Sequence, residues 1–563
     1  MSDWFRKKPS MSNAAATKTA IFTSLWLISF LLLSCGGGGG NGDGESLETP
    51  VFPPVVFLAD RDTQGTLELY ASFDDGTDII KLSGAMVSGG NVVDFEVSPN
   101  GIYVAYVADQ DTDNLFELYV VPVDKTSGES AVKVSVPLAG IGIKETVLGS
   151  GVYLFAWAPN SSRVAYISDA ADAIVEIVDF FELFSSTPNG IEKNVISELV
   201  NSNSDVEDFQ WEPDSTLIAY VADQDFVGEL ELYVAQSDGD DPSVSVSGAM
   251  AGNGIKENPA GSGEFAFAWA PDSSRLAYIA DQFFLDKFEL FTSTPNGISN
   301  LLISGPFGIN QDVEEFEWAP DSQRIAYTAN QNSANAIDLF TAPPNVIASS
   351  QINSSGMGAG QAVIAFKWAP DNSRIAFISD KGVTGFFRLY TVQPINNNDI
   401  FVSGSISDPS DVTEFDWSPD SSLIAYLVVA PGVELYTTFP ASGSSIQITG
   451  DRAAIGDVSD FEWAPNSSRI AYTADHDVGG ASELFSSTPD NDDTDQVSGE
   501  LVSGGGVGEF KWAPDSSGVG YIADQNTINV SELFASRPNG NDNTRLSGNL
   551  VAGGDVVVFA WVP

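Results

Sequence analysis

Acidic residues recur at the ends of predicted strands in this 563-residue chain, and in several places another acid follows two residues later. Oxygen ligands at alternate positions suit Ca²⁺, which takes six to eight of them. No loop holds the full twelve-residue calcium pattern, and Asp side chains that cap turns would explain the same repetition. The loop acids that we consider as calcium ligands are Asp109, Asp111, Asp113, Asp223, Asp225, Asp475 and Asp477.

A second acidic set lies in or just before another recurring strand. If these strands surround a channel, their converging like charges would create a negative potential suited to cations or to a basic partner segment. Acids that merely keep the protein soluble are the alternative interpretation. The candidate channel residues are Asp94, Asp208, Glu264, Glu315, Glu414, Asp460, Glu509 and Asp555.

Other site chemistries find little support in the sequence. One His and one Cys cannot form a Cys/His zinc site or a disulfide framework, and His476 lies in a variable loop. No Gly-x-Ser-x-Gly elbow is present. A glycosidase needs only two carboxylates, so that enzyme class stays open.

The charge balance narrows the range of partners. Acids outnumber bases 77 to 24, a formal charge of -53, which would repel a phosphate backbone and excludes nucleic acid as a partner. Hydrophobic residues make up 43% of the chain, with 52 Gly and 29 Pro. This composition indicates a folded, turn-rich chain and argues against an all-helical one.

The first 34 residues have the pattern of a signal peptide, with basic residues before the apolar run Ile21–Leu33. The run ends in Leu32-Leu33-Ser34-Cys35, which resembles the bacterial lipoprotein box, so we expect Cys35 to be lipidated. An ordinary secretory signal is the alternative. Gly36 follows the Cys, and the resemblance then implies sorting to the outer membrane. Loss of residues 1–34, with four bases and one acid, would take the charge to -56.

The remainder of the chain is one repeated unit. A motif close to aromatic-x-Trp-x-Pro recurs at intervals of 46 to 58 residues, which predicts a propeller or a solenoid. Because each Trp holds the same place in its unit, we expect these side chains to pack between units rather than to bind a ligand. The nine motif tryptophans are Trp157, Trp211, Trp269, Trp318, Trp368, Trp417, Trp463, Trp512 and Trp561.

Within a unit, alternating apolar stretches and turn residues predict four antiparallel strands, which is one propeller blade. Residues 55–70 supply the second and third strands of a blade that lacks its first, and Val558–Pro563 supply a first strand alone. These fragments complete one another, so we predict an all-β propeller of about ten blades closed by its terminal strands. Two smaller packed propellers are the alternative.

The repeated run reads Trp-Ala-Pro-Asp-Ser-Ser-Arg-Ile-Ala-Tyr with small variations, as at Trp269–Tyr278. It resembles the WD-like propeller repeats of the TolB family, whose consensus is Trp-Ser-Pro-Asp-Gly. The resemblance covers most of residues 55–563 and implies the propeller fold. TolB proteins have six blades and an N-terminal α/β domain, so the resemblance supports the fold much more strongly than a role in the Tol–Pal system, which stays open.

These observations divide the chain into a signal peptide (1–34), a Gly-rich tether that starts at Cys35 (35–54) and a propeller body (55–563). We expect a monomeric outer-membrane lipoprotein, facing the periplasm or the cell surface, that touches the membrane through its lipid only. Its expected role is a non-catalytic platform for envelope proteins or polysaccharide. The alternatives are a calcium-assisted glycan-processing enzyme that uses channel carboxylates, and a structural role in envelope assembly.

Overall fold

The fold is seen in a computed structural model of the chain. It describes residues 52–124, 130–147, 149–170, 180–199, 204–259, 261–305, 307–354, 357–404, 410–430, 432–449, 457–475 and 481–563. The predicted signal peptide, Cys35 and most of the predicted tether lie outside the described residues. Within the described ranges the regular elements are strands, and no helix could span a membrane.

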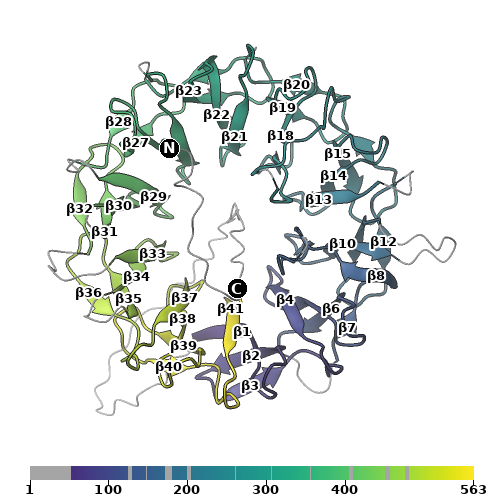
Figure 1. Ribbon diagram of the computed structural model, residues 1–563, viewed down its shortest axis with the longest axis vertical. Coiled ribbons are helices and arrows are strands. Elements are labelled where there is room, and N and C mark those ends of the chain that lie inside the picture. The colour runs from purple at the N-terminus through teal and green to yellow at the C-terminus, as the bar shows by residue number, and fades with distance from the viewer. Residues whose placement is uncertain are drawn as a thin grey trace, which may run out of the picture.

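Ten β-sheets are arranged side by side around a central opening, so the chain forms one ten-bladed propeller (Figure 1). This confirms the predicted ten blades and excludes the alternative of two smaller propellers. Blade 1 holds β41, β1, β2 and β3, and blades 2 to 10 follow in chain order. The first strand of each blade lies nearest the opening and the fourth lies at the outer rim.

The first strands of blades 1 to 10 are β41 (Val556–Trp561), β4 (Val92–Val97), β9 (Phe155–Trp157), β13 (Val206–Trp211), β17 (Phe267–Trp269), β21 (Val313–Trp318), β25 (Val363–Trp368), β29 (Asp411–Trp417), β33 (Val458–Trp463) and β37 (Val507–Trp512). The second strands are β1 (Phe52–Ala59), β5 (Tyr103–Ala108), β10 (Val164–Ala170), β14 (Leu217–Ala222), β18 (Leu276–Ala280), β22 (Ile325–Ser333), β26 (Ile375–Ser379), β30 (Ile424–Val429), β34 (Ile470–Asp475) and β38 (Val519–Ala523).

The third strands are β2 (Glu68–Asp74), β6 (Glu117–Pro122), β11 (Glu182–Ser186), β15 (Glu231–Gln236), β19 (Glu289–Ser293), β23 (Ala336–Ala342), β27 (Arg388–Val392), β31 (Val433–Thr438), β35 (Ser482–Ser487) and β39 (Glu532–Ser536). The fourth strands are β3 (Asp78–Lys81), β7 (Val132–Lys133), β12 (Lys193–Val195), β16 (Val244–Ser245), β20 (Asn300–Leu302), β24 (Ser350–Gln351), β28 (Ile400–Phe401), β32 (Ser445–Gln447), β36 (Thr494–Gln496) and β40 (Thr544–Arg545). Blade 3 has an additional strand, β8 (Leu138–Ile143), which pairs with β10 beyond the short β9.

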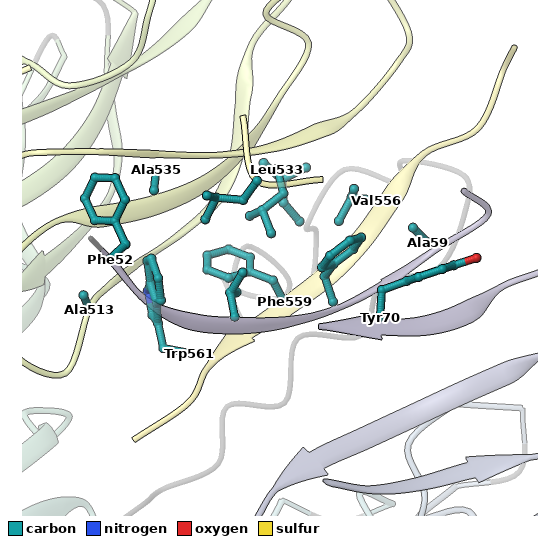
Figure 2. Packing of buried hydrophobic residues seen from close by; sticks show 13 residues of the cluster. Phe52, Ala59, Tyr70, Ala513, Leu533, Ala535, Val556, Phe559 and Trp561 are labelled. Atoms are coloured by element: carbon teal, nitrogen blue, oxygen red, sulfur yellow. The ribbon is translucent and has the colours of Figure 1, made fainter. Parts of the chain in front are cut away.

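Blade 1 combines strands from the two ends of the described chain. Strand β1 pairs antiparallel with β41, which places Phe57 opposite Phe559. Figure 2 shows Phe559 and Trp561 of this blade beside Leu533 of blade 10. Main-chain hydrogen bonds and a shared apolar cluster therefore close the ring, as the complementary fragments predict. Strand β1 begins at Phe52, so the sheet includes three residues that the sequence places in the tether.

The core consists of apolar clusters between neighbouring blades. Alternate residues of a strand point to opposite sides of its sheet, and in this ring both sides face another blade. Second strands are therefore buried along both faces, as at Ile325–Ala329 of β22. Within a blade, aromatic rings of the second and third strands stack, as Tyr327 does on Phe340 with centroids 5.2 Å apart. This two-sided burial explains why these strands read as continuous apolar runs.

The motif tryptophans join neighbouring blades, in agreement with the predicted packing role. Trp318 donates its indole Nε1–H to the main-chain oxygen of Ala268 in the preceding blade at 3.1 Å. All nine motif tryptophans make the corresponding bond, at distances between 3.0 and 3.3 Å. Blade 2 has Val97 at this position and no indole to donate.

A second series of bonds joins the turns between first and second strands. Ser322 has a φ of 62°, and its hydroxyl oxygen accepts the main-chain N–H of Asp272 in the preceding blade at 3.0 Å. The TolB-type consensus has Gly at this position, which adopts positive φ at no steric cost. Here the serine supplies a bond between blades that glycine could not make.

Candidate functional site

The acids at the ends of the second strands cap nearby loops. Asp223 accepts the main-chain N–H groups of Asp205 and Gly228, each at 2.7 Å. Asp109 accepts those of Asn91 and Asn114, at 2.6 and 2.9 Å. Each carboxylate thus joins the loop before its blade's first strand to the loop after its second strand. This is the arrangement expected if these acids cap turns, the alternative to calcium binding considered from the sequence.

The second acids of these loops do not gather around a common point. Asp111 pairs with Lys133 at 2.9 Å, while Asp225 is exposed. Asp113 lies in the same loop as Asp111, and Asp475 ends β34; Asp477 falls outside the described residues. In the part of the chain that the structure describes, no three His, Cys, Asp or Glu side chains form a group that could hold a metal ion. Calcium binding stays a prediction.

Asp555 belongs to a set of caps rather than to the channel wall. It precedes β41 and accepts the main-chain N–H of Ser531 in blade 10 at 2.7 Å. Asp205, Asp312, Asp411 and Asp457 hold the same position in other blades and make the same bond. The sequence places Asp555 with the channel acids because it adjoins a first strand, but its carboxylate faces the preceding blade.

Asp94 and Asp208 lie on first strands and join blades to one another. Asp208 accepts the main-chain N–H of Phe209 in its own strand at 2.7 Å and that of Phe265 in the next blade at 3.3 Å. Asp94 accepts the N–H of Tyr153 in the next blade at 3.4 Å. Desolvation is the main cause that raises the pKa of Asp208 to about 7. These two carboxylates stabilise blade junctions.

The residue just before each Trp also lies at a blade junction, and the predicted site did not include it. Glu317 accepts the main-chain N–H of Trp368 at 3.1 Å, and Glu462 accepts that of Trp512 at 3.2 Å. Burial raises the pKa of Glu317 to about 8 and that of Glu462 to about 7. The two-residue strand period, counted from the channel acids Glu315 and Asp460, would have identified both.

Six carboxylates gather on the inner strands of blades 6, 8 and 9. Burial is the main cause that raises the pKa of Glu414, and the negative charges of Asp460 and Asp416 raise it further. The charge of Asp416 also raises the pKa of both Glu317 and Glu462. We define the channel acid arc as Glu315, Glu317, Glu414, Asp416, Asp460 and Glu462.

Three lysines border this arc. Lys256 pairs with Glu314 at 3.2 Å, and its charge opposes the rise that burial causes in the pKa of Glu315. Lys367 of blade 7 contacts Asp416 at 2.5 Å. Lys511 of blade 10 donates to the main-chain oxygen of Phe559 at 2.9 Å and contacts the predicted channel residue Glu509 at 2.6 Å. Glu264, the remaining predicted channel residue, is exposed and lies just before β17 in blade 5, apart from the arc. Of the predicted channel set, the structure therefore brings together Glu414 and Asp460 on adjacent inner strands, while Glu315 lies beside Glu317 on β21.

Fold and site together define a many-bladed β-propeller with an acidic stretch on its inner wall. No protein-family model matches the sequence, and no curated protein matches it. Membership of the TolB-type family therefore stays a prediction.

Solved structures with some likeness exist at low identity. The chain is similar to a eukaryotic initiation factor, with 11% identity, 91% of this chain and 99% of that chain covered, and a TM-score of 0.48. Dipeptidyl peptidase 4 of Porphyromonas gingivalis is 13% identical, with 70% of this chain and 57% of that chain covered and a TM-score of 0.45. An oligogalacturonate lyase of Vibrio parahaemolyticus is 11% identical, with 58% of this chain and 88% of that chain covered and a TM-score of 0.34. At these scores the likenesses carry no argument about function, and the strand topology by itself defines the propeller.

Proposed function

We propose that this protein is a lipid-anchored propeller of the bacterial envelope that binds proteins or polymers without catalysing a reaction. The channel acid arc is the proposed contact surface, and a basic protein segment is the ligand class that it fits best. The observation that carries this proposal is the convergence of Glu414, Asp416 and Asp460 on adjacent inner strands. There the negative charges of Asp416 and Asp460 disfavour the ionisation of Glu414. A bound cationic segment would relieve this repulsion.

The recurring bond at the position before Trp argues for a platform rather than an enzyme. Gln210 holds this position in blade 4 and accepts the N–H of Trp269 at 3.0 Å, as Glu317 does with Trp368. An amide cannot transfer a proton as a carboxyl can, so the role shared by these residues is to join blades. We therefore assign Glu317 and Glu462 a structural role within the arc. The proposed contacts with a ligand fall to the other four members, Glu315, Glu414, Asp416 and Asp460.

Binding of a ten-residue lysine peptide tests the arc directly. The triple variant Glu315→Gln, Glu414→Gln, Asp460→Asn should bind the peptide at least tenfold more weakly at low salt. The matched control Asp225→Asn, Asp240→Asn, Asp241→Asn changes the net charge equally at exposed acids outside the arc and should bind within about twofold of wild type. Equal loss in both variants would contradict a defined site. A pull-down from envelope extract at low and high salt then identifies natural partners, since electrostatic ones dissociate at high salt.

A glycan-processing enzyme is the second candidate, and one observation favours it. The raised pKa of Glu317, about 8, leaves this carboxyl protonated at neutral pH, as a general acid requires, and Asp416 is close enough to raise that pKa. Hydrolysis of envelope polysaccharide that disappears in the variant Glu317→Gln, with the fold intact, would replace the platform proposal by this one.

The lipid anchor has its own test. Wild-type protein expressed in a Gram-negative host should incorporate labelled palmitate and fractionate with the outer membrane. The variant Cys35→Ser should do neither, because Cys35 is the chain's only cysteine. Incorporation of label into the variant would refute lipidation at this residue.

A further inference from the structure

At the outer edge of one face of the ring, the turns of four adjacent blades contain almost no charged residues. The turns between third and fourth strands of blades 5 to 8 span residues 294–299, 343–349, 393–399 and 439–444. Their one charged residue is Asp399, whose side chain is 7% exposed and pairs with Lys381 at 2.6 Å. The corresponding turns on either side hold Asp238, Asp240 and Asp241 in blade 4, and Asp490, Asp492 and Asp493 in blade 9. In a chain with 77 acids, this interruption marks a surface of different character.

These four turns expose apolar side chains. Ile298 is 84% exposed, Ile395 is 72%, Ile347 is 67% and Phe439 is 46%. We define the apolar rim as Ile298, Val346, Ile347, Ile395 and Phe439. At its end, beside blade 9, a hollow of about 340 Å³ is lined by Phe439, Ile446 and Pro489, among other residues. Large exposed apolar side chains that recur on adjacent elements indicate a contact surface.

Buried hydrogen bonds between blades hold the rim in place. The Thr292 hydroxyl of blade 5 donates to the main-chain oxygen of Pro344 in the next turn at 2.6 Å. The same bond recurs from Thr341 to Pro394 at 2.7 Å. It recurs again from Thr391 to Pro440 at 2.6 Å, and all three threonines are fully buried. The rim is therefore a preorganised surface, which lowers the entropic cost of binding.

The chain enters the propeller on the same face. Phe52, the first residue of β1, lies opposite Asp74, which directly precedes the turn between β2 and β3. Blade 1 and blade 6 lie at opposite sides of the ring (Figure 1). The predicted lipid site, Cys35, precedes Phe52 by 17 residues, which could span at most about 60 Å if fully extended. An anchored ring would thus keep this face close to the bilayer.

We propose that the apolar rim contacts the lipid bilayer and, together with the anchor near blade 1, lays this face of the ring flat on the membrane. This inference rests on the lipid anchor of the proposed function and adds a second point of attachment to it. Apolar side chains that enter the headgroup region strengthen the hold of a lipid chain. Nearer the channel, the same face exposes Asp321 and Asp371, so the rim should prefer zwitterionic to anionic lipids.

A fluorescent label tests the contact without any need for lipidation at Cys35. The chain from residue 36 onward retains every described strand and core cluster and contains no cysteine. A hexahistidine tag at its N-terminus attaches it to nickel-chelating lipids in phosphatidylcholine vesicles. An environment-sensitive dye is placed at Ile347→Cys in the rim or at Phe284→Cys, which is 61% exposed on the opposite face.

The dye at position 347 should shift its emission to shorter wavelength and be quenched by brominated lipid, whereas the dye at position 284 should do neither. With the tag released by imidazole, the double variant Ile298→Asp, Ile395→Asp should retain at least tenfold less protein on vesicles than the unsubstituted chain. A dye at position 347 that stays in water on vesicles, or that becomes buried only when envelope proteins are added, overturns the proposal. Absence of palmitate labelling at Cys35 would instead refute the anchor, and the vesicle result would stand independently.

Discussion

The indole Nε1–H of Trp561 donates a hydrogen bond to the main-chain oxygen of Lys511 at 3.1 Å. Trp561 ends β41 in blade 1 and Lys511 lies in β37 of blade 10, so this bond crosses the junction where the ring closes. It repeats the bond found at eight other blade junctions. The closing junction is therefore held by the same contacts as the internal ones.

The tryptophan bonds predict additive losses of stability. Trp561→Phe and Trp318→Phe should each lower the free energy of unfolding by about 1–2 kcal/mol, because each leaves a main-chain oxygen at a blade junction without its donor. The double variant should lose the sum, since the two junctions share no partner. Urea unfolding measures all three losses, and single variants as stable as wild type would show that ring packing alone holds the junctions.

The turn serines predict opposite results for two similar substitutions. Ser322→Gly should leave stability within about 0.5 kcal/mol of wild type, because relief at a φ of 62° offsets the lost bond to Asp272. Ser322→Ala should lower it by about 1–2 kcal/mol, because it loses the bond and keeps the strain. Thermal unfolding of both proteins checks this, and equal losses would contradict the proposed balance.

The loop caps predict a clear difference between two acids of one loop. Asp223→Ala should lower the free energy of unfolding by about 1–3 kcal/mol, because two main-chain N–H groups lose their acceptor. Asp225→Ala, at an exposed position of the same loop, should change it by less than about 0.5 kcal/mol. Capping also predicts equal melting temperatures with EDTA and with added calcium. A calcium-dependent rise that Asp225→Ala removes would instead establish calcium binding.

The pKa of Glu317 predicts how stability depends on pH. This pKa lies at about 8 in the folded protein against 4.5 when unperturbed, so the folded state binds the proton more tightly. The resulting stabilisation is complete below pH 4.5 and is lost as the pH rises through about 8. Glu317→Gln cannot ionise and should gain on the order of 4 kcal/mol relative to wild type between pH 5 and pH 9. Urea unfolding at both pH values measures this gain, and a stability difference between the two proteins that is the same at both would contradict the prediction.

Much of the fold could be predicted because the repeat is regular. The interval between tryptophans predicted the ring, and the incomplete units at residues 55–70 and 558–563 predicted its closure. The site was less predictable, because a strand position does not tell which neighbour a carboxylate meets. Asp555 and Asp460 both adjoin or occupy a first strand, yet Asp555 caps the preceding blade whereas Asp460 lies in the channel acid arc.

The sequence by itself determined the blade, since strand period, turn residues and Trp position act within some 50 residues of chain. Only the tertiary structure decided which acids converge and which turns form a common rim. Glu317 and Asp416 lie 99 positions apart in the sequence, and Ile298 and Phe439 lie 141 positions apart. Each pair shares a surface only because ten blades close into one ring. Contacts between blades depend on this closure, which places residues of distant repeats on one wall or one face.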